Sequence, residues 1–300
     1  MLVGVERRNG AVAMPSTHAE LAEPTPEGGG VSRLDKSAGA IVREADRRRR
    51  SDRRSLVRRA HDAPLWGTVM LAVDGGELPE DSALQGTRVD GFEIGKYPVM
   101  KEEYEWIRSW GMDKNYSLSP GQGPGNSYPV THVSWYDAVK WCNAKSEHEL
   151  LVPLYTINGQ VYRRGEYGPD GSKLVAFNER ANGYRLPTEA EWEWAARGGP
   201  CSRGHQYSGS NEADEVSWHE ANAEGKPRPV GLKAANELGI HDMSGNVWEW
   251  CWDLDESTSA NRLRGGSWKH RAVNGTVTYR VSRTPDSRYS VIGFRLARNG

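Results

Sequence analysis

The chain has 300 residues, of which 37% are hydrophobic, and a formal net charge of −1. This length and composition predict one sizeable core with a small appendage, and the near-neutral charge gives the whole chain no electrostatic reason to seek nucleic acid. A mean hydropathy of −0.74 without a long apolar run excludes a membrane-spanning helix. The opening residues carry charges at Glu6, Arg7 and Arg8 and no export or lipid-anchor signal, so we expect a cytoplasmic protein.

Cysteine and tryptophan usage constrains the class further. Cys142, Cys201 and Cys251 cannot form a disulfide framework and lack zinc spacing, so we expect buried structural thiols. The chain also has 12 Trp and 34 Gly. These numbers predict many short strands and shaped loops held by indole rings, and they argue against a bundle of long helices.

The first part of the chain, residues 1–64, differs from the remainder. Residues 15–30 are rich in Pro, Glu, Gly and Ser and read as disordered. The Arg-rich segment 43–59 predicts a solvated charged helix, or alternatively a contact with nucleic acid or an acidic partner. We therefore divide the chain into a partly helical N-terminal extension, 1–64, and a globular domain, 65–300.

The globular domain opens with two predicted strands and a helix. The run GTVMLAV ends in Asp74-Gly75-Gly76, and the segment 89–99 repeats this pattern of a strand entering a turn. Residues 101–110 have apolar side chains at helical intervals, which predicts the first helix. Its inner side is formed by Tyr104, Ile107 and Trp110.

Two further helices are marked by capping boxes. Ser134 and Asp137 form the first box, and Thr188 and Glu191 form the second, with Gly198-Gly199 as its stop. The inner face of the earlier helix is Ala138, Val139 and Cys142.

The remaining segments complete an α+β class. Between the capped helices, residues 151–164 predict a hairpin that turns at Asn158-Gly159. After Gly231 the chain consists of short strands and irregular loops. We therefore expect a few helices packed near a small, mostly antiparallel sheet.

Five segments taken together resemble the successive signatures of formylglycine-generating-enzyme (sulfatase-modifying factor) type domains. In order, they are 129–143, 182–199, 242–253, 264–268 and 284–297. The resemblance covers residues 65–300 and implies a variant of the C-type lectin fold, with a small antiparallel sheet, few helices and long irregular loops. The family includes oxidases, domains of sulfoxide synthases and binding modules, so the fold alone does not determine function.

The catalytic residues of the family are missing. In catalytic members, two cysteines that bind copper follow the GGS motif, and soft thiolates are what Cu(I) requires. The corresponding positions here are His270 and Gly275, and no cysteine follows Cys251. The His-rich iron site of sulfoxide synthases is also missing. We therefore expect no enzyme activity and no copper, and we interpret His270 as a surface or binding residue.

The segment 242–249 is the candidate metal site. The resemblance implies a structural calcium ion, held through the set Asp242, Gly245, Val247 and Glu249. Oxygen donors at alternating loop positions suit a hard cation of flexible geometry. The alternative is that Asp242 stabilises a turn and Glu249 pairs with an arginine.

The C-terminal segment, about 264–297, resembles the variable region of proteins diversified by retroelements. In such regions the adenines of Asn codons are randomised, which can never yield Lys, Glu, Gln, Met or Trp. After Trp268 only Lys269 belongs to those five types, so Lys269 is a fixed position or a departure from the pattern. The predicted variable, ligand-binding positions are Lys269, His270, Val273, Asn274, Gly275, Thr278, Tyr279, Val281, Ser282, Ser287, Tyr289, Ser290 and Val291.

A fixed frame alternates with these positions. Its members are Trp268, Ala272, Arg280, Arg283, Thr284-Pro285-Asp286, Arg288 and Gly293-Phe294-Arg295. Diversification demands a scaffold whose core does not depend on the changing side chains. We therefore expect Trp268 and Phe294 to anchor the core, the arginines to hydrogen-bond loop carbonyls or carboxylates, and the variable side chains to point outward.

These observations predict a non-catalytic, bacterial or phage-associated binding protein that displays a diversified surface to a protein or other macromolecule. Two alternatives remain open. One is a formylglycine-generating or related oxidase acting on cysteine-containing substrates, and the other is an invariant accessory or regulatory binding domain. The alternative to diversification of the C-terminal segment is an ordinary terminal hairpin in a degenerate relative of the enzymes.

Overall fold

The structure is a computed structural model that describes residues 68–168, 170–178, 180–255 and 257–300. The expectations for the N-terminal extension and its Arg-rich segment lie outside these residues. Within the described part of the chain, no helix combines the length and apolar character needed to cross a membrane.

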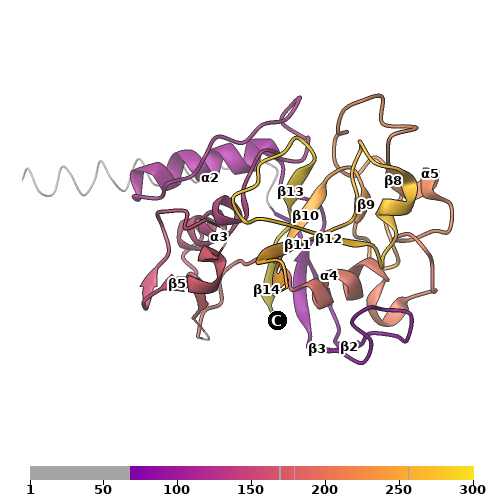
Figure 1. The fold of residues 1–300 in the computed structure, drawn as a ribbon, viewed down its shortest axis with the longest axis horizontal. Helices are drawn as coiled ribbons and strands as arrows, with labels where there is room; N and C mark the ends of the chain where they lie inside the picture. Colours follow the sequence, from indigo (N-terminus) through magenta and orange to yellow (C-terminus); the bar gives the residue numbers. More distant parts are fainter. Residues whose placement is uncertain (1–67, 169, 179, 256) are drawn as a thin grey trace, which may run out of the picture. The chain divides into compact units, whose positions relative to one another are not determined.

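A four-stranded sheet forms the centre of the domain (Figure 1). Its strands lie in the order β12 (Arg280–Arg283), β11 (Ala260–Arg264), β10 (Trp248–Asp255) and β13 (Ile292–Phe294). The pairs β12–β11 and β11–β10 are antiparallel, whereas β10 and β13 are parallel. The last part of the chain therefore supplies both edges of this sheet.

The alternation of side chains along β10 separates two cores. The indole rings of Trp248, Trp250 and Trp252 enter the first core, which the sheet forms with α2 (Lys101–Asp113) and α3 (Trp135–His148). Cys251, on the opposite face of the strand, enters the second core, which packs against α4 (Glu189–Ala196).

A second sheet of three antiparallel strands contributes to the second core. Its order is β1 (Met70–Val73), β4 (Phe92–Gly95) and β14 (Ala297–Asn299). The first two strands confirm the two predicted from residues 67–99. Shorter pairs complete the strands: β2 (Gly76–Glu77) with β3 (Arg88–Val89), and β8 (Ser217–Trp218) with β9 (Ser244–Gly245).

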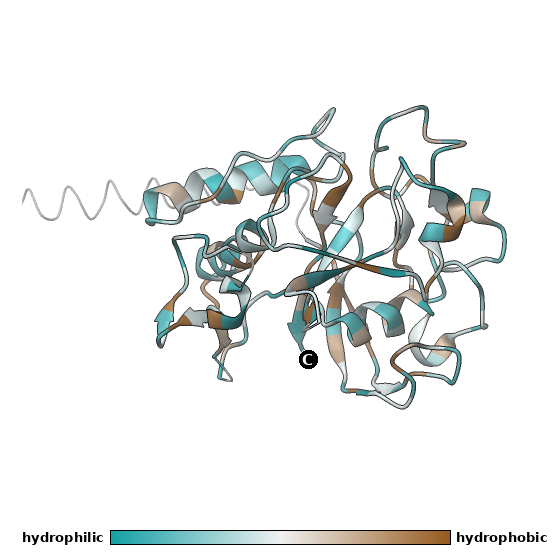
Figure 2. Cartoon of the chain, in the orientation of Figure 1, coloured by the Kyte–Doolittle hydropathy of each residue, from teal (hydrophilic) through white to brown (hydrophobic). Residues whose placement is uncertain are grey.

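The three predicted helices are confirmed. Helix α2 runs to Asp113, three residues beyond the predicted end, and bands of hydrophilic and hydrophobic residues alternate along it (Figure 2). Both capping boxes form, with the side chains of Ser134 and Thr188 accepting from the backbone N–H of Asp137 and Glu191. Residues that cap a helix act locally, which is why the sequence predicts them well.

The predicted hairpin is also confirmed. Strands β5 (Tyr155–Ile157) and β6 (Gln160–Val161) pair across Asn158 and Gly159, whose φ angles are 51° and 74°. These left-handed values are those of a tight hairpin turn. Strand β7 (Ala176–Phe177) pairs with the other edge of β5. The remaining elements are α5 (Ala213–Val216) and the 3-10 turns η1 (Gly171–Leu174), η2 (Gly199–Cys201) and η3 (Ala272–Gly275).

One cysteine expectation was wrong. Cys142 and Cys251 are buried, and burial raises the pKa of both thiols. Cys201 is exposed, because it lies at the end of η2 beyond the left-handed Gly198 that terminates α4.

Candidate binding surface

The segment that carries the predicted variable positions crosses the front of the central sheet (Figure 1). Its backbone is fixed by hydrogen bonds to other segments. The N–H of His132 donates to the carbonyl of Tyr289 at 3.1 Å, and the N–H of Trp248 donates to the carbonyl of Val291 at 2.8 Å. The segment is therefore held by main-chain contacts that do not depend on its own side chains.

Most of the predicted variable positions reach solvent. Lys269, Val273 and Tyr289 are exposed. A second group is half-buried: His270, Asn274, Thr278, Tyr279, Val281, Ser282, Ser287, Ser290 and Val291.

Gly275 is the exception to the expectation that the variable positions point outward. It is buried, and a Cβ atom placed on it would lie 3.3 Å from both the amide nitrogen of Gly245 and the carbonyl oxygen of Gly265. The backbone approach of two loops leaves little room for a side chain there. We therefore leave Gly275 out of the surface.

Strand β12 divides its own residues between two environments. Val281, like Tyr279 before it, packs against the first core, and Arg283 follows at the same two-residue spacing. Ser282 points the other way: its hydroxyl accepts from Arg262 at 2.8 Å and donates to Asp255 at 3.2 Å. Ser282 is therefore engaged in a polar network at the edge of the surface.

An aromatic cluster forms the floor of the surface. The ring of Trp248 lies 5.7 Å from that of His270 and 6.0 Å from that of Tyr279. The Nδ1 atom of His270 lies 2.6 Å from the hydroxyl of Ser267 and 3.3 Å from the indole nitrogen of Trp248, which donates to it. Burial lowers the pKa of His270, and the charges of Arg283 and Lys269 lower it further, whereas Glu220 acts against them.

Three of the four frame arginines, Arg280, Arg288 and Arg295, pair with carboxylates, as expected from the sequence. Arg280 donates to Glu189 at 2.6 Å, and the guanidinium of Arg288 lies 2.9 Å from Asp137, the residue that completes the capping box of α3. Arg283 is exposed and donates only to the carbonyl of Ser282 next to it. These contacts attach the C-terminal segment to α3 and α4.

The two aromatic residues of the frame differ in burial. Phe294 is fully buried and meets the stacked rings of Tyr104 and Trp141 edge to face, as expected for a core anchor. Trp268 is only half-buried, and its indole N–H donates to the carbonyl of Ser290 at 3.2 Å. Trp268 thus supports the surface loop, and the expectation that it anchors the core was wrong.

A buried arginine outside the frame also attaches this part of the chain to α4, and the sequence did not predict it. Arg264 is fully buried and donates to Glu189 at 2.8 Å and to Glu193 at 2.7 Å. A signal was present, because Glu189 and Glu193 are four residues apart and therefore share one face of α4. Which arginine meets them depends on the pairing of distant strands.

The carboxylates of the predicted calcium loop already have partners in the protein. Glu249 is buried, and both its oxygens accept from Arg295 at 2.8 Å, while the indole of Trp192 adds a third bond at 2.7 Å. Asp242 accepts from the backbone N–H of Gly231 at 2.7 Å. These contacts match the alternative of a turn at Asp242 and an ion pair at Glu249, in which Arg295 supplies the positive charge.

The two residues of that set that would offer backbone carbonyls are also buried. Gly245 has a φ of 78°, and its N–H donates to the carbonyl of Gly265 at 2.6 Å. Val247 is buried against Gly293. In the described part of the chain, no three residues among His, Cys, Asp and Glu gather into a metal-binding group.

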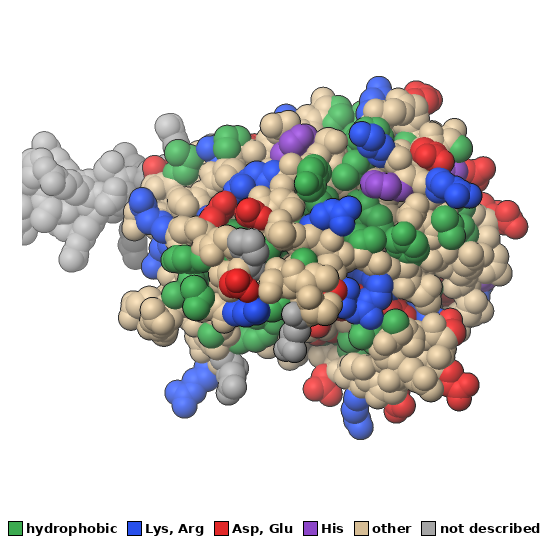
Figure 3. All heavy atoms as spheres, viewed as in Figure 1, with side chains coloured by type: hydrophobic (Ala, Val, Ile, Leu, Met, Phe, Trp, Pro, Cys, Tyr) green, Lys and Arg blue, Asp and Glu red, His purple; other side chains and the backbone are tan. Residues whose placement is uncertain are grey.

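Figure 3 shows the face that carries the C-terminal segment. Hydrophobic and histidine side chains gather near its centre with Lys and Arg beside them, and carboxylates lie to the left and along the right rim. The centre of the surface is therefore apolar and basic.

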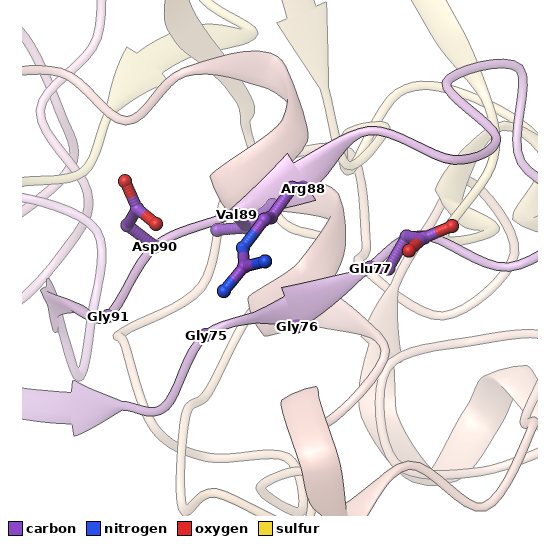
Figure 4. Close-up of a pocket in the computed structure, with 7 residues that line it drawn as sticks. All are labelled: Gly75, Gly76, Glu77, Arg88, Val89, Asp90 and Gly91. Carbon is purple, nitrogen blue, oxygen red and sulfur yellow. The ribbon is translucent and has the colours of Figure 1, made fainter.

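A separate hollow lies beside the β2–β3 hairpin (Figure 4). Its charged lining residues are Glu77, Arg88 and Asp90, and their side chains point in different directions. No predicted site residue lines it, and its charged groups do not converge on a common point.

The fold and the surface define a C-type-lectin-type domain with a C-terminal segment displayed on its central sheet. The chain belongs to the family of sulfatase-modifying factor enzyme 1-like domains, whose model matches residues 57–300.

Relatives in this family include both active and inactive proteins. The chaperone protein LppX of Paenibacillus barcinonensis is 38% identical over 70% of this chain and 82% of the relative. The inactive C-alpha-formylglycine-generating enzyme 2 of Bos taurus is 29% identical over 58% of this chain, which is only 54% of that relative. A formylglycine-generating enzyme of Thermomonospora curvata is 29% identical over 66% of this chain and 65% of the relative.

Two solved structures share the fold closely. Variable protein 1 of Treponema denticola superimposes with a TM-score of 0.66 and 30% identity, covering 79% of this chain and all of that chain. The protein CarF superimposes with a TM-score of 0.68 and 31% identity, covering 78% of this chain and 99% of that chain. The chain therefore has the fold of this family in the form that a variable protein also uses.

Proposed function

We propose that this protein is a non-catalytic binding protein whose C-terminal segment is diversified and displayed to a macromolecular ligand. The observation that carries the proposal is that residues 268–295 contain two kinds of side chain, one that reaches solvent and one that contacts the scaffold. The predicted variable side chains other than Gly275 reach solvent, whereas Arg280, Arg288 and Phe294 attach the segment to the scaffold. Exchanging the exposed side chains leaves those attachments intact.

The chemistry of the surface supports binding without turnover. The positions that hold thiolates in catalytic relatives are His270 and Gly275, and the nearest cysteine in sequence, Cys251, is buried with a raised pKa. A thiolate is the reactive form, so a buried thiol of high pKa is a poor nucleophile and a poor copper ligand. The printed names of two relatives, a chaperone and an inactive enzyme, agree with this role.

The proposed partner is a protein or another macromolecule. Half-buried Tyr279 and exposed Tyr289 provide large contact area at low entropic cost, and the Ser and Asn side chains nearby provide adaptable hydrogen bonds.

Comparison of the gene between closely related genomes tests the proposal. We expect differences to concentrate at the predicted variable positions that reach solvent, from His270 to Val291, and the frame to stay constant. Copies that are identical there, or that vary evenly along the domain, would instead favour an invariant accessory domain.

A further inference from the structure

Three cations of the C-terminal segment have no partner of opposite charge. Lys269, Arg271 and Arg283 are exposed, and none of them lies within 4.0 Å of a carboxylate among the described residues. Three other arginines that border the surface are paired: Arg262 with Asp255, Arg280 with Glu189, and Arg288 with Asp137. The unpaired cations therefore leave positive charge that a partner can neutralise.

Lys269 and Arg283 are the two of these cations whose charges act on His270. Lys269 precedes His270 in the chain, and both charges lower the pKa of the imidazole, whereas Glu220 acts in the opposite direction. A carboxylate supplied by a partner would neutralise these cations, because opposite charges at a partly buried surface attract.

The two cations also belong to the constant part of the surface under the proposed function. Lys cannot arise from an Asn codon by exchange of adenines, so Lys269 is a fixed position in that scheme, and Arg283 belongs to the frame. Their charge is therefore present whichever side chains the variable positions carry. Constant charges of this kind steer encounters and act on every variant alike.

The surroundings of the cations favour a peptide over a nucleic acid. Arg283 lies on β12, an edge strand of the central sheet, and no other described strand pairs with its outer side. An extended peptide can add to such an edge through its backbone, with Tyr279 and Val281 offering apolar contacts on one face of the strand. Three unpaired cations are few for a nucleic-acid site, which neutralises many phosphates at once.

We propose that Lys269 and Arg283 form a constant basic clamp that selects extended acidic peptide segments of a partner protein, while the variable side chains between and around them choose among such segments. This inference rests on the proposed function, since it takes the same surface as the binding site. It adds a partner class that is common to all variants.

A peptide-display selection tests the clamp with a defined probe. The full chain is used to select from a random phage-displayed library of peptides about twelve residues long, which is enough to span an edge strand. The same selection is made with the double variant K269E/R283E, with the charge-conserving variant K269R/R283K, and with R88E, which reverses an exposed arginine on β3 beside the separate hollow. Thermal unfolding of each variant confirms that it is folded.

We expect the native chain, K269R/R283K and R88E to select peptides enriched in Asp and Glu, and K269E/R283E to lose that enrichment. A synthetic copy of a selected peptide should bind K269E/R283E about tenfold more weakly than the native chain at low salt, and the difference should shrink as salt rises. Selection of peptides without acidic enrichment, failure to select any peptide, or tighter binding of labelled oligothymidylate than of the peptides would overturn the clamp. These outcomes do not change the diversity among natural gene copies, so the proposed function is tested separately from the clamp.

Discussion

Arg264 is a buried guanidinium that joins β11 to α4 through Glu189 and Glu193. Two carboxylates and the carbonyl of Val277 accept its hydrogen bonds, and these contacts offset the free energy of removing the guanidinium from water. Arg280 of the edge strand β12 pairs in register with Arg264 and donates to the same Glu189. The position of the displayed segment therefore depends on a buried ion-pair network.

Replacing Arg264 should be costly. We expect Arg264→Met to lower the free energy of unfolding by about 3 kcal/mol, because it removes the fully buried cation that Glu189 and Glu193 share and leaves them only arginine partners that are less buried. Urea denaturation measures the change. The matched control is Arg271→Met, which changes an exposed arginine of the same segment and should cost less than about 0.5 kcal/mol. Equal costs for the two variants would show that the network does not hold the sheet to α4.

His270 reports the charge of the surface. Its folded-state pKa is lowered below the ordinary value of 6.5 by burial, then by Arg283 and Lys269. Arg283→Glu should raise this pKa and Arg88→Glu should leave it unchanged, as measured by the NMR titration of the ring, assigned with His270→Gln. An unchanged titration in Arg283→Glu would mean that the guanidinium does not face the imidazole.

The same shift has a consequence for stability. A histidine whose pKa is depressed on folding contributes stability that is present above 6.5 and is lost as the pH falls through its folded-state pKa. We therefore expect His270→Gln to lose less stability than the native chain between neutral pH and about pH 5, as followed by urea denaturation across that range. Part of the acid loss should persist, because burial also lowers the pKa of His132 and His148. A variant that loses stability as steeply as the native chain would contradict the assignment.

At the scale of elements, local sequence patterns predicted the helices and the hairpin, whereas contacts between residues far apart in the sequence could not be predicted. The capped helices and the Asn158-Gly159 hairpin follow from residues a few positions apart, and all are confirmed. The burial of Gly275 could not be foreseen, because it results from the approach of loops at Gly245 and Gly265. The partners of Glu249 likewise depend on β10 lying beside β13, which the sequence does not specify.

The displayed segment should tolerate change unevenly. The double variant Val273→Ser, Tyr289→Ser should lower the free energy of unfolding by less than about 1 kcal/mol, since these side chains are 47% and 51% exposed. Gly275→Asn should cost about 2 kcal/mol or more, because its side chain must displace backbone atoms 3.3 Å away. Exchange of adenines in an Asn codon can produce Ser and can also leave Asn, so both variants carry residues that diversification could place there. Thermal unfolding of the two variants is compared. An equally small loss of stability in Gly275→Asn would show that position 275 can carry a variable side chain.

At the scale of the whole domain, one sheet separates two cores and displays its edge strand. The scaffold is completed by ion pairs such as Arg295 with Glu249, which occupy the loop predicted to hold calcium. We expect chelation or added calcium to move the midpoint of thermal unfolding by less than about 1 °C, because no free carboxylate is available in that loop to bind the ion. A rise of several degrees with calcium, absent with magnesium, would show that the loop rearranges to bind it.

The central claim is that a constant scaffold carries a diversified surface. The most direct test is DNA sequencing of the gene and its downstream flank, in search of a second copy of the codons for residues 264–297. We predict a near-copy whose mismatches fall at adenines in the codons of the exposed and half-buried positions, close to a reverse-transcriptase gene. A flank without such a copy would contradict diversification and leave a family member that binds one fixed partner.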